Sequence, residues 1–158
     1  MSRELILSNG SDTFQDRNAN GSQGEKLFVD YCQKKGYKLH RMGFDESNDR
    51  VNNFYKLNFF LRNLPDFIVD TGADIRVVQV KGSPNIKATE YDNIPLFMSY
   101  YCSKQAMLQY AFCFNPQPNE EFKPIWVYPD TVMSLYDKGV PGVWSDGVKY
   151  RKISFDKK

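Results

Sequence analysis

The stretch PDFIVDTGADIRVVQVK, residues 65–81, decides the fold. It holds two segments rich in Ile, Val and Phe, Asp66–Val69 and Asp74–Lys81, and this composition favours strands. Between them stands the triplet TGA, whose small residues and glycine are typical of a turn. The stretch therefore predicts a β-hairpin.

Upstream of the hairpin, the pattern predicts one helix and one strand. Apolar residues recur at helical spacing over about Gln23–Lys35, with Ser22 as the N-cap and Gly36 as the stop signal. Alternating residues over Tyr37–Met42 predict the strand.

Downstream of the hairpin, Gly82, Pro84 and Asn85 predict a loop. The elements expected after it are a second helix over Leu96–Gln109, strands over Tyr110–Phe114 and Pro124–Tyr128, a short helix capped by Asp130 and running to Asp137, and a strand or hairpin around Lys149–Phe155. The order helix, strand, strand, strand, helix, strand predicts an α/β fold with a central mixed sheet flanked by helices.

Length and composition indicate one globular domain. The chain has 158 residues, of which 41% are apolar and 25% charged, enough to bury a core of ordinary size. Residues 10–24 are rich in Asn, Ser, Asp, Gln and Gly, so residues 1–21 are expected to be a flexible N-terminal segment. Residues 22–158 are expected to form a single domain.

The overall charge and the apolar pattern limit the partners. A net charge of +2 provides no strong polycationic field, so any attraction for nucleic acid has to be local. No apolar run reaches the roughly 20 residues that cross a bilayer, and the start of the chain lacks a signal-peptide pattern. A cytoplasmic protein with no membrane partner is expected.

Cysteine and histidine are too few for two common kinds of site. Cys32, Cys102 and Cys113 lack metal-ligand spacing and are interpreted as reduced thiols inside a core. His40 is the only histidine and is interpreted as a strand residue near the surface. A zinc centre of the usual Cys/His type and a Ser-His-Asp triad are therefore both hard to assemble.

One group of polar residues carries the chemistry that the sequence predicts. Side chains alternate between the faces of a strand, so Gln79 and Lys81 are expected on one face, with Asp66 near the same end of the neighbouring strand. Asp66, the Gln79 amide oxygen and the Val80 backbone carbonyl are hard oxygen ligands suited to Mg²⁺. Lys81 would position or deprotonate an attacking water, or neutralise the transition state. This predicts metal-assisted hydrolysis of a phosphodiester bond.

These residues also resemble a known signature. Pro65-Asp66, followed thirteen residues after Asp66 by Gln79-Val80-Lys81, is similar to the motif of the PD-(D/E)XK nuclease superfamily, and the similarity covers roughly residues 22–114. The superfamily includes restriction enzymes, Holliday-junction resolvases, recombination exonucleases and many phage nucleases. The resemblance implies a restriction-endonuclease-like αβββαβ core and a Mg²⁺- or Mn²⁺-dependent nuclease acting on DNA, structure-specific in some members.

The chain departs from that motif at one position, where Gln79 replaces the usual acidic residue. The resemblance then implies weaker or more selective metal binding. Many members carry a glutamate in the first core helix, and Glu25 stands where it is expected, able to restore part of the charge through a coordinated water. A second interpretation of Glu25 has equal weight: Ser22 and Glu25 match the spacing of a capping box.

Further candidates would contact the nucleic acid. The basic residues in or near loops flanking the site are Arg41, Lys56, Arg62 and Lys87, and they are expected to contact phosphates unless they are scattered surface charges. Lys104 and Gln105, with Ser103, stand on the predicted second helix, where a solvated face is the alternative. The aromatic residues 54–61 stack on bases, form a homodimer surface or, most often for such a run, are buried.

The interpretation that unites these features is a Mg²⁺-dependent nuclease that hydrolyses DNA. Three alternatives stay open: a catalytically inactive nucleic-acid-binding module of the same fold, an RNA-cleaving nuclease, and a structural or regulatory α/β protein without phosphate chemistry.

Overall fold

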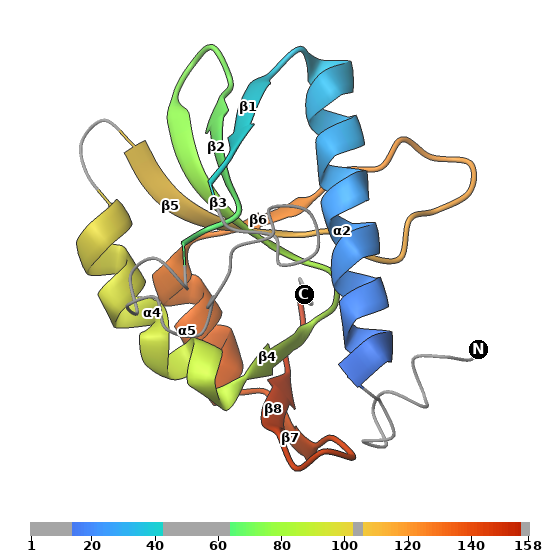
Figure 1. Ribbon diagram of the computed structural model, residues 1–158, viewed down its shortest axis with the longest axis vertical. Helices are drawn as coiled ribbons and strands as arrows, with labels where there is room; N and C mark the ends of the chain where they lie inside the picture. The colour runs from blue at the N-terminus through green and yellow to red at the C-terminus, as the bar shows by residue number, and fades with distance from the viewer. Residues whose placement is uncertain (1–13, 43–63, 103–105, 156–158) are drawn as a thin grey trace, which may run out of the picture.

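The computed structural model describes residues 14–42, 64–102 and 106–155 (Figure 1). Its elements are α2 Phe14–Lys35, β1 Lys38–Arg41, β2 Phe67–Asp70, β3 Ile75–Lys81, β4 Asn85–Lys87, α4 Ala88–Tyr101, β5 Ala106–Phe112, β6 Ile125–Val127, α5 Pro129–Asp137, β7 Val140–Val143 and β8 Lys149–Lys152.

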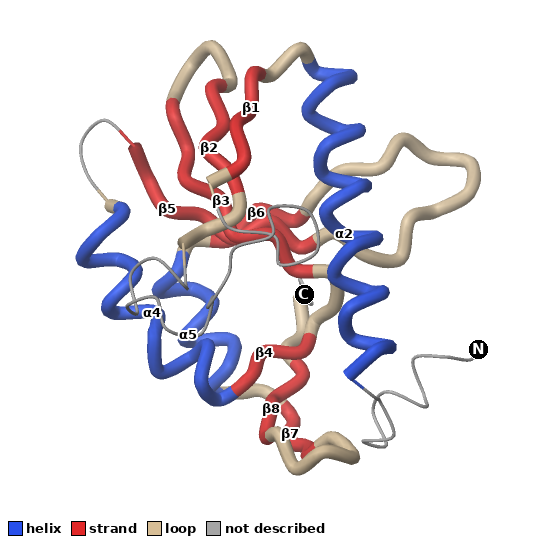
Figure 2. The backbone as a smooth tube through the Cα atoms, in the orientation of Figure 1, coloured by secondary structure: helices blue, strands red, loops and turns tan. Residues whose placement is uncertain are grey.

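A five-stranded sheet in the order β1-β2-β3-β5-β6 forms the centre of the fold. Strands β3 and β5 are parallel, whereas the other neighbours are antiparallel, so the sheet is mixed. Figure 2 shows this sheet between helix α2 on one side and helices α4 and α5 on the other. The predicted α/β class, with a central mixed sheet flanked by helices, is confirmed.

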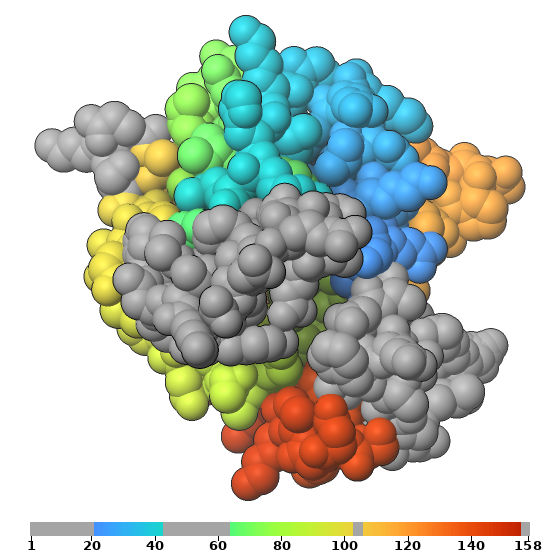
Figure 3. Space-filling model, viewed as in Figure 1, coloured from blue at the N-terminus to red at the C-terminus, as the bar shows by residue number. Residues whose placement is uncertain are grey.

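A second, smaller sheet lies at one end of the molecule, where β7 and β8 project from the rest (Figure 3). It has the order β4-β8-β7 and is antiparallel throughout. The strand expected around Lys149–Phe155 is confirmed by β8, but Asn85 begins strand β4 and does not belong to a loop as predicted.

Two hydrophobic clusters fill the two sides of the central sheet. Val77 packs with Leu108 and Tyr110 in the cluster that contains residues of α4 and α5. Val78 and Val80 pack in the cluster that contains residues of α2. Because side chains alternate along a strand, β3 directs residues 79 and 81 toward the α4 and α5 side. The predicted facing of β3 is thus confirmed.

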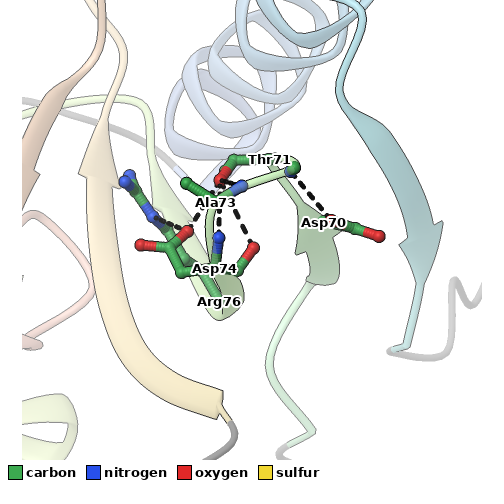
Figure 4. Close-up of polar contacts among 6 residues, drawn as sticks. Asp70, Thr71, Ala73, Asp74 and Arg76 are labelled. Carbon is green, nitrogen blue, oxygen red and sulfur yellow. Dashed lines mark hydrogen bonds and ion pairs between the residues drawn. The ribbon is translucent and has the colours of Figure 1, made fainter.

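The β2–β3 hairpin is confirmed and its turn is held by polar contacts (Figure 4). The Thr71 hydroxyl donates to Asp74 Oδ1 at 2.8 Å, and the Gly72 N–H donates to Asp70 Oδ1 at 2.9 Å. Gly72 has a φ of 91°, which a glycine adopts at no steric cost. Arg76 Nε bonds Asp74 Oδ1 at 3.1 Å and extends the network along β3. These contacts set the register that brings the far ends of the two strands together.

The first helix differs from its prediction at the N-terminus. Helix α2 begins at Phe14, so the start expected at Gln23 is wrong, and Ser22 lies inside the helix where it cannot be an N-cap. Propensity did not show this extension because Asn, Ser and Gly weaken a helix and are more often found in turns. Whether residues 1–21 are flexible, and whether residues 22–158 form one domain, stay predictions.

The second helix differs more. It spans Ala88–Tyr101, so the predicted helix Leu96–Gln109 is wrong, and residues 106–109 begin strand β5. Residues 108–112 are all buried because α2 covers one face of β5 and α4 and α5 cover the other. A strand buried on both faces gives a continuous apolar run that periodicity does not distinguish from a helix.

Three smaller predictions can be compared with the structure. The predicted cap Asp130 is wrong, because helix α5 starts at Pro129 with Tyr128 as its N-cap. His40 is exposed on β1, as expected, and Cys32 and Cys113 are buried thiols, but Cys102 is exposed. Residues 54–61 lie outside the described residues.

Within the described ranges, no helix has the length and apolar character needed to cross a membrane.

Candidate active site

Three hydrogen bonds hold Asp66 in place, one donated by its N–H and two accepted by its oxygens. Its N–H donates to the Val78 carbonyl at 3.0 Å, and its carbonyl accepts from the Met42 N–H at 2.8 Å. Its side-chain Oδ2 accepts from the Val80 N–H at 2.8 Å. Asp66 therefore connects the end of β1 to β3 and its carboxylate has a defined position beside β3.

The end of β3 extends past its partner strand at this point. Phe67, the first residue of β2, pairs with Val78, so residues 79–81 have no partner in β2. The N–H and C=O of one strand residue point to the same side, and the Val80 N–H points to Asp66. The Val80 carbonyl therefore points toward the Asp66 side as well, as the predicted ligand set requires.

Charged groups from three other elements act on the Asp66 carboxyl. Burial, followed by the negative charge of Glu25, raises the pKa of Asp66 to about 7, against the Val80 N–H and the cations Arg41 and Lys81, which lower it. Arg41 Nη2 also bonds Glu25 Oε1 at 3.0 Å. The structure thus brings Glu25 and Lys81 within electrostatic reach of Asp66, on opposite sides of the sheet end.

Glu25 has no part in a capping box, because it lies in the interior of α2 and its carboxylate bonds Arg41. The capping-box interpretation of Glu25 is therefore wrong. The other interpretation, a carboxylate near the site, agrees with its effect on Asp66. Arg41 is exposed on β1 and bonded to that carboxylate, and its contact with phosphate stays a prediction.

Lys81 is paired with a residue that the sequence analysis did not single out. Its Nζ donates to Glu90 Oε2 at 2.6 Å, and Glu90 Oε1 accepts from the Lys87 N–H at 2.8 Å. Burial raises the pKa of Glu90, but the Lys81 ammonium and these hydrogen bonds outweigh it and leave that pKa lowered. The signal was the spacing of Lys87 and Glu90 at a helix start, which was missed because the helix was predicted to begin only at Leu96.

Gln79 is half-buried on β3 and lies opposite Tyr110 of β5 in the parallel register. Within the part of the chain that the structure describes, its amide makes no hydrogen bond that would occupy its oxygen. The pKa of the Tyr110 hydroxyl is raised by burial and then by the charges of Glu90 and Asp66. The Tyr110 hydroxyl is therefore near both carboxylates. Gln79 is therefore available as a neutral oxygen donor in an acidic setting.

The donor set fits a hard divalent cation in its chemistry. Among residues 14–42, 64–102 and 106–155, no three His, Cys, Asp or Glu side chains form a metal-binding group. The oxygens present instead are the carboxylates of Asp66 and Glu25, the amide of Gln79 and the carbonyl of Val80. Magnesium accepts such mixed oxygen ligands and retains water at its other positions. The repulsion between the two carboxylates is also a cost that a cation would remove.

The remaining predicted contacts can be placed only in part. Lys87 is exposed at the start of α4, next to the Lys81–Glu90 pair. The other four predicted nucleic-acid contacts and Ser103 lie outside the described residues: Lys56, Arg62, Ser103, Lys104 and Gln105.

Close packing of α2 against the β3–β4 connection brings Glu25 to the site. A Cβ on Gly24 would lie 2.7 Å from Gly82 Cα and 3.2 Å from the Cys113 carbonyl oxygen. Both neighbours are backbone atoms, so the helix would have to move. Gly24 therefore permits the approach that places Glu25 near Asp66.

We expect Gly24→Ala to lower the free energy of unfolding by about 1–3 kcal/mol, because it overpacks a backbone contact. The matched control is Gly21→Ala, one turn earlier in the same helix, where a Cβ meets nothing within 4 Å. That change should raise stability by up to about 1 kcal/mol through helix propensity. Chemical denaturation of both variants measures the pair, and equal effects would contradict the close approach.

Comparison with known proteins gives little beyond these observations. No family model matches the chain, and no curated protein matches it. Among solved structures, the chain is similar to Hjc, a Holliday junction resolvase from the archaeal hyperthermophile Archaeoglobus fulgidus, with 12% identity and a TM-score of 0.45. The match covers 84% of this chain and 88% of that chain. A similarity this distant carries no functional argument. The argument for function therefore rests on the chain's own residues.

Proposed function

We propose that the chain is a metal-dependent nuclease that hydrolyses phosphodiester bonds in DNA, with its active site at Asp66, Gln79, Val80 and Lys81. The observation that carries the proposal is the Asp66 side chain bonded to the Val80 N–H, where the end of β3 extends past β2. This contact sets the Asp66 carboxylate beside the segment of β3 that carries Gln79 and Lys81, which supports the proposal.

In this proposal Asp66, Gln79 and the Val80 carbonyl hold Mg²⁺ or Mn²⁺, with Glu25 contributing through water. When bound, the ion offsets the negative charge that builds up on the phosphate during displacement. Asp66 supplies the anionic ligand, and because its pKa is raised to about 7, the ion competes with a proton for this carboxylate. Gln79 supplies an oxygen without charge, which keeps the site less anionic than an acidic triplet.

Lys81 acts on the scissile phosphate from the α4 side. Its ammonium is paired with Glu90, so it is held in one place and does not rotate freely in solvent. A fixed positive charge next to a phosphate stabilises a pentavalent transition state more than it stabilises the ground state. Water attacks phosphorus and gives up one proton to solvent, the bond from phosphorus to one sugar oxygen breaks, and that oxygen takes up a proton from solvent as it leaves.

The proposed substrate is DNA with a branch or an end. The net charge of +2 disfavours tight binding to long duplex without regard to structure. Arg41 and Lys87 stand on the two sides of the site and would contact the backbone on either side of the scissile bond. Cytoplasmic location and a homodimeric assembly belong to the same proposal.

A cleavage assay on four-way junction, flap, duplex and single-stranded DNA, with an RNA of matched sequence, tests the proposal. We expect cleavage of at least one branched DNA with Mg²⁺ or Mn²⁺ and none with a chelator. Binding of all substrates without cleavage would favour the inactive binding module, and cleavage of RNA alone would favour the ribonuclease. If the protein neither binds nor cleaves any of these substrates, the proposed function is wrong and only the description of the fold stands.

A further inference from the structure

We propose that Glu90 is a positioning residue for this reaction, which holds the Lys81 ammonium at one place beside the scissile phosphate. The inference rests on the proposed function, because it assigns Glu90 a role through Lys81 and not through contact with substrate. Glu90 lies outside the motif that the sequence resembles.

The first observation is the geometry of the pair. Lys81 Nζ and Glu90 Oε2 are 2.6 Å apart, and the two side chains are 14% and 25% exposed. A free lysine side chain loses rotamer entropy when it is confined to one conformation. A short, largely shielded ion pair confines the Lys81 side chain before substrate binds, so this entropy is not lost during the reaction.

The second observation is that Glu90 is itself held from the other side. Its Oε1 accepts from the Lys87 N–H at 2.8 Å, in the first turn of α4. A carboxylate at this position is also favoured by the unpaired N–H groups of the helix start. The same side chain thus ties β3 to the start of α4, and the packing of α4 on the sheet determines where the Lys81 ammonium lies.

The third observation excludes a rival arrangement of Lys81. Asp66 is an alternative acidic partner, and the Lys81 charge acts on it. The bonds are nevertheless divided, since Asp66 Oδ2 receives the Val80 N–H and Lys81 Nζ bonds Glu90. Glu90 therefore leaves the Asp66 carboxylate free to serve as a metal ligand.

The test is a double-mutant cycle on the chemical step. E90Q keeps an oxygen that accepts the Lys87 N–H but removes the charge that pairs with Lys81. We expect it to lower the single-turnover cleavage rate by about 10–100-fold, because a misplaced catalytic group costs this much. Affinity for uncut DNA should stay within about twofold, since binding does not depend on the pair. In a Lys81→Ala background, E90Q should have no further effect on the rate.

D92N is the matched control, because it removes one exposed carboxylate two residues further along α4 and should leave the rate unchanged. An equal loss from E90Q in both backgrounds would overturn the proposal, as would an active wild type whose E90Q variant keeps its full rate. Wild-type protein without nuclease activity would overturn the proposed function and this role together, so the two failures are distinct.

A second measurement does not depend on the folding of the variant. Amine acetylation of the wild-type protein, followed by mass spectrometry, compares Lys81 with the exposed Lys149. We expect Lys81 to react at least about tenfold more slowly, because its ammonium is bonded and shielded. Equal reactivity would show an unrestrained lysine and overturn the proposal.

Discussion

Asp66→Asn is expected to lower the cleavage rate by at least about a hundredfold and, in the absence of metal, to stabilise the protein at about pH 8. The two effects have one cause. Asparagine keeps an oxygen that accepts the Val80 N–H, so the position of the side chain is retained. It removes the partly buried negative charge on which the proposed metal site depends.

The direction of the stability change follows from the pKa of Asp66, which is about 7 in the folded protein and therefore above that of an unfolded chain. Such a group stabilises the fold when protonated, and this contribution is lost as the pH rises through about 7. At about pH 8 the charged carboxylate destabilises the folded state, and its removal should raise the free energy of unfolding by about 1–3 kcal/mol.

Thermal unfolding with and without Mn²⁺ measures both effects in one experiment. The unfolding temperature of the wild type should rise on addition of Mn²⁺. That of Asp66→Asn should be higher without the metal and should not change when Mn²⁺ is added. Asp30→Asn, on the exposed face of α2, is the control and should behave like the wild type. A variant that still gains stability from Mn²⁺ would remove Asp66 from the ligand set.

Lys81→Ala is expected to lower the cleavage rate by at least about a hundredfold while leaving Mn²⁺ affinity nearly unchanged. The ammonium is assigned to the transition state and not to the metal, so the two measurements should separate. The variant also leaves the partly buried Glu90 carboxylate without its partner, which should destabilise the fold by about 1–3 kcal/mol.

Single-turnover kinetics and Mn²⁺ titration, on the same preparation, test this separation. Lys149→Ala, on β8, removes an exposed lysine from another part of the molecule and is the control. Retained cleavage in Lys81→Ala would exclude the lysine from the chemistry. A parallel loss of metal affinity and cleavage would instead assign it to the organisation of the metal site.

The hairpin and the facing of β3 could be predicted from sequence because both depend on local signals. The TGA turn and the alternation of apolar residues are contained in a single stretch, and Asp66 follows from the register that the turn imposes. The order of elements was predictable for the same reason. Most of the predicted strands lie within a few residues of their observed bounds.

Other parts depend on tertiary contacts that no local pattern contains. Strand β5 is buried on both faces, so its apolar run was taken for the end of a helix, and α4 was placed too late in the chain. Glu90 was missed with it, because its role depends on a lysine nine residues away in sequence and on another element. The Gly24 approach is also invisible until α2 and the β3–β4 connection are packed.

The most direct test of the central claim is anomalous diffraction from a crystal of the protein soaked in Mn²⁺. We expect one peak within ligand distance, about 2.0–2.4 Å, of an Asp66 carboxylate oxygen and the Val80 carbonyl, with the Gln79 amide oxygen completing the set. A fully occupied Mn²⁺ elsewhere, with the Asp66 carboxylate lacking any ion, would contradict it.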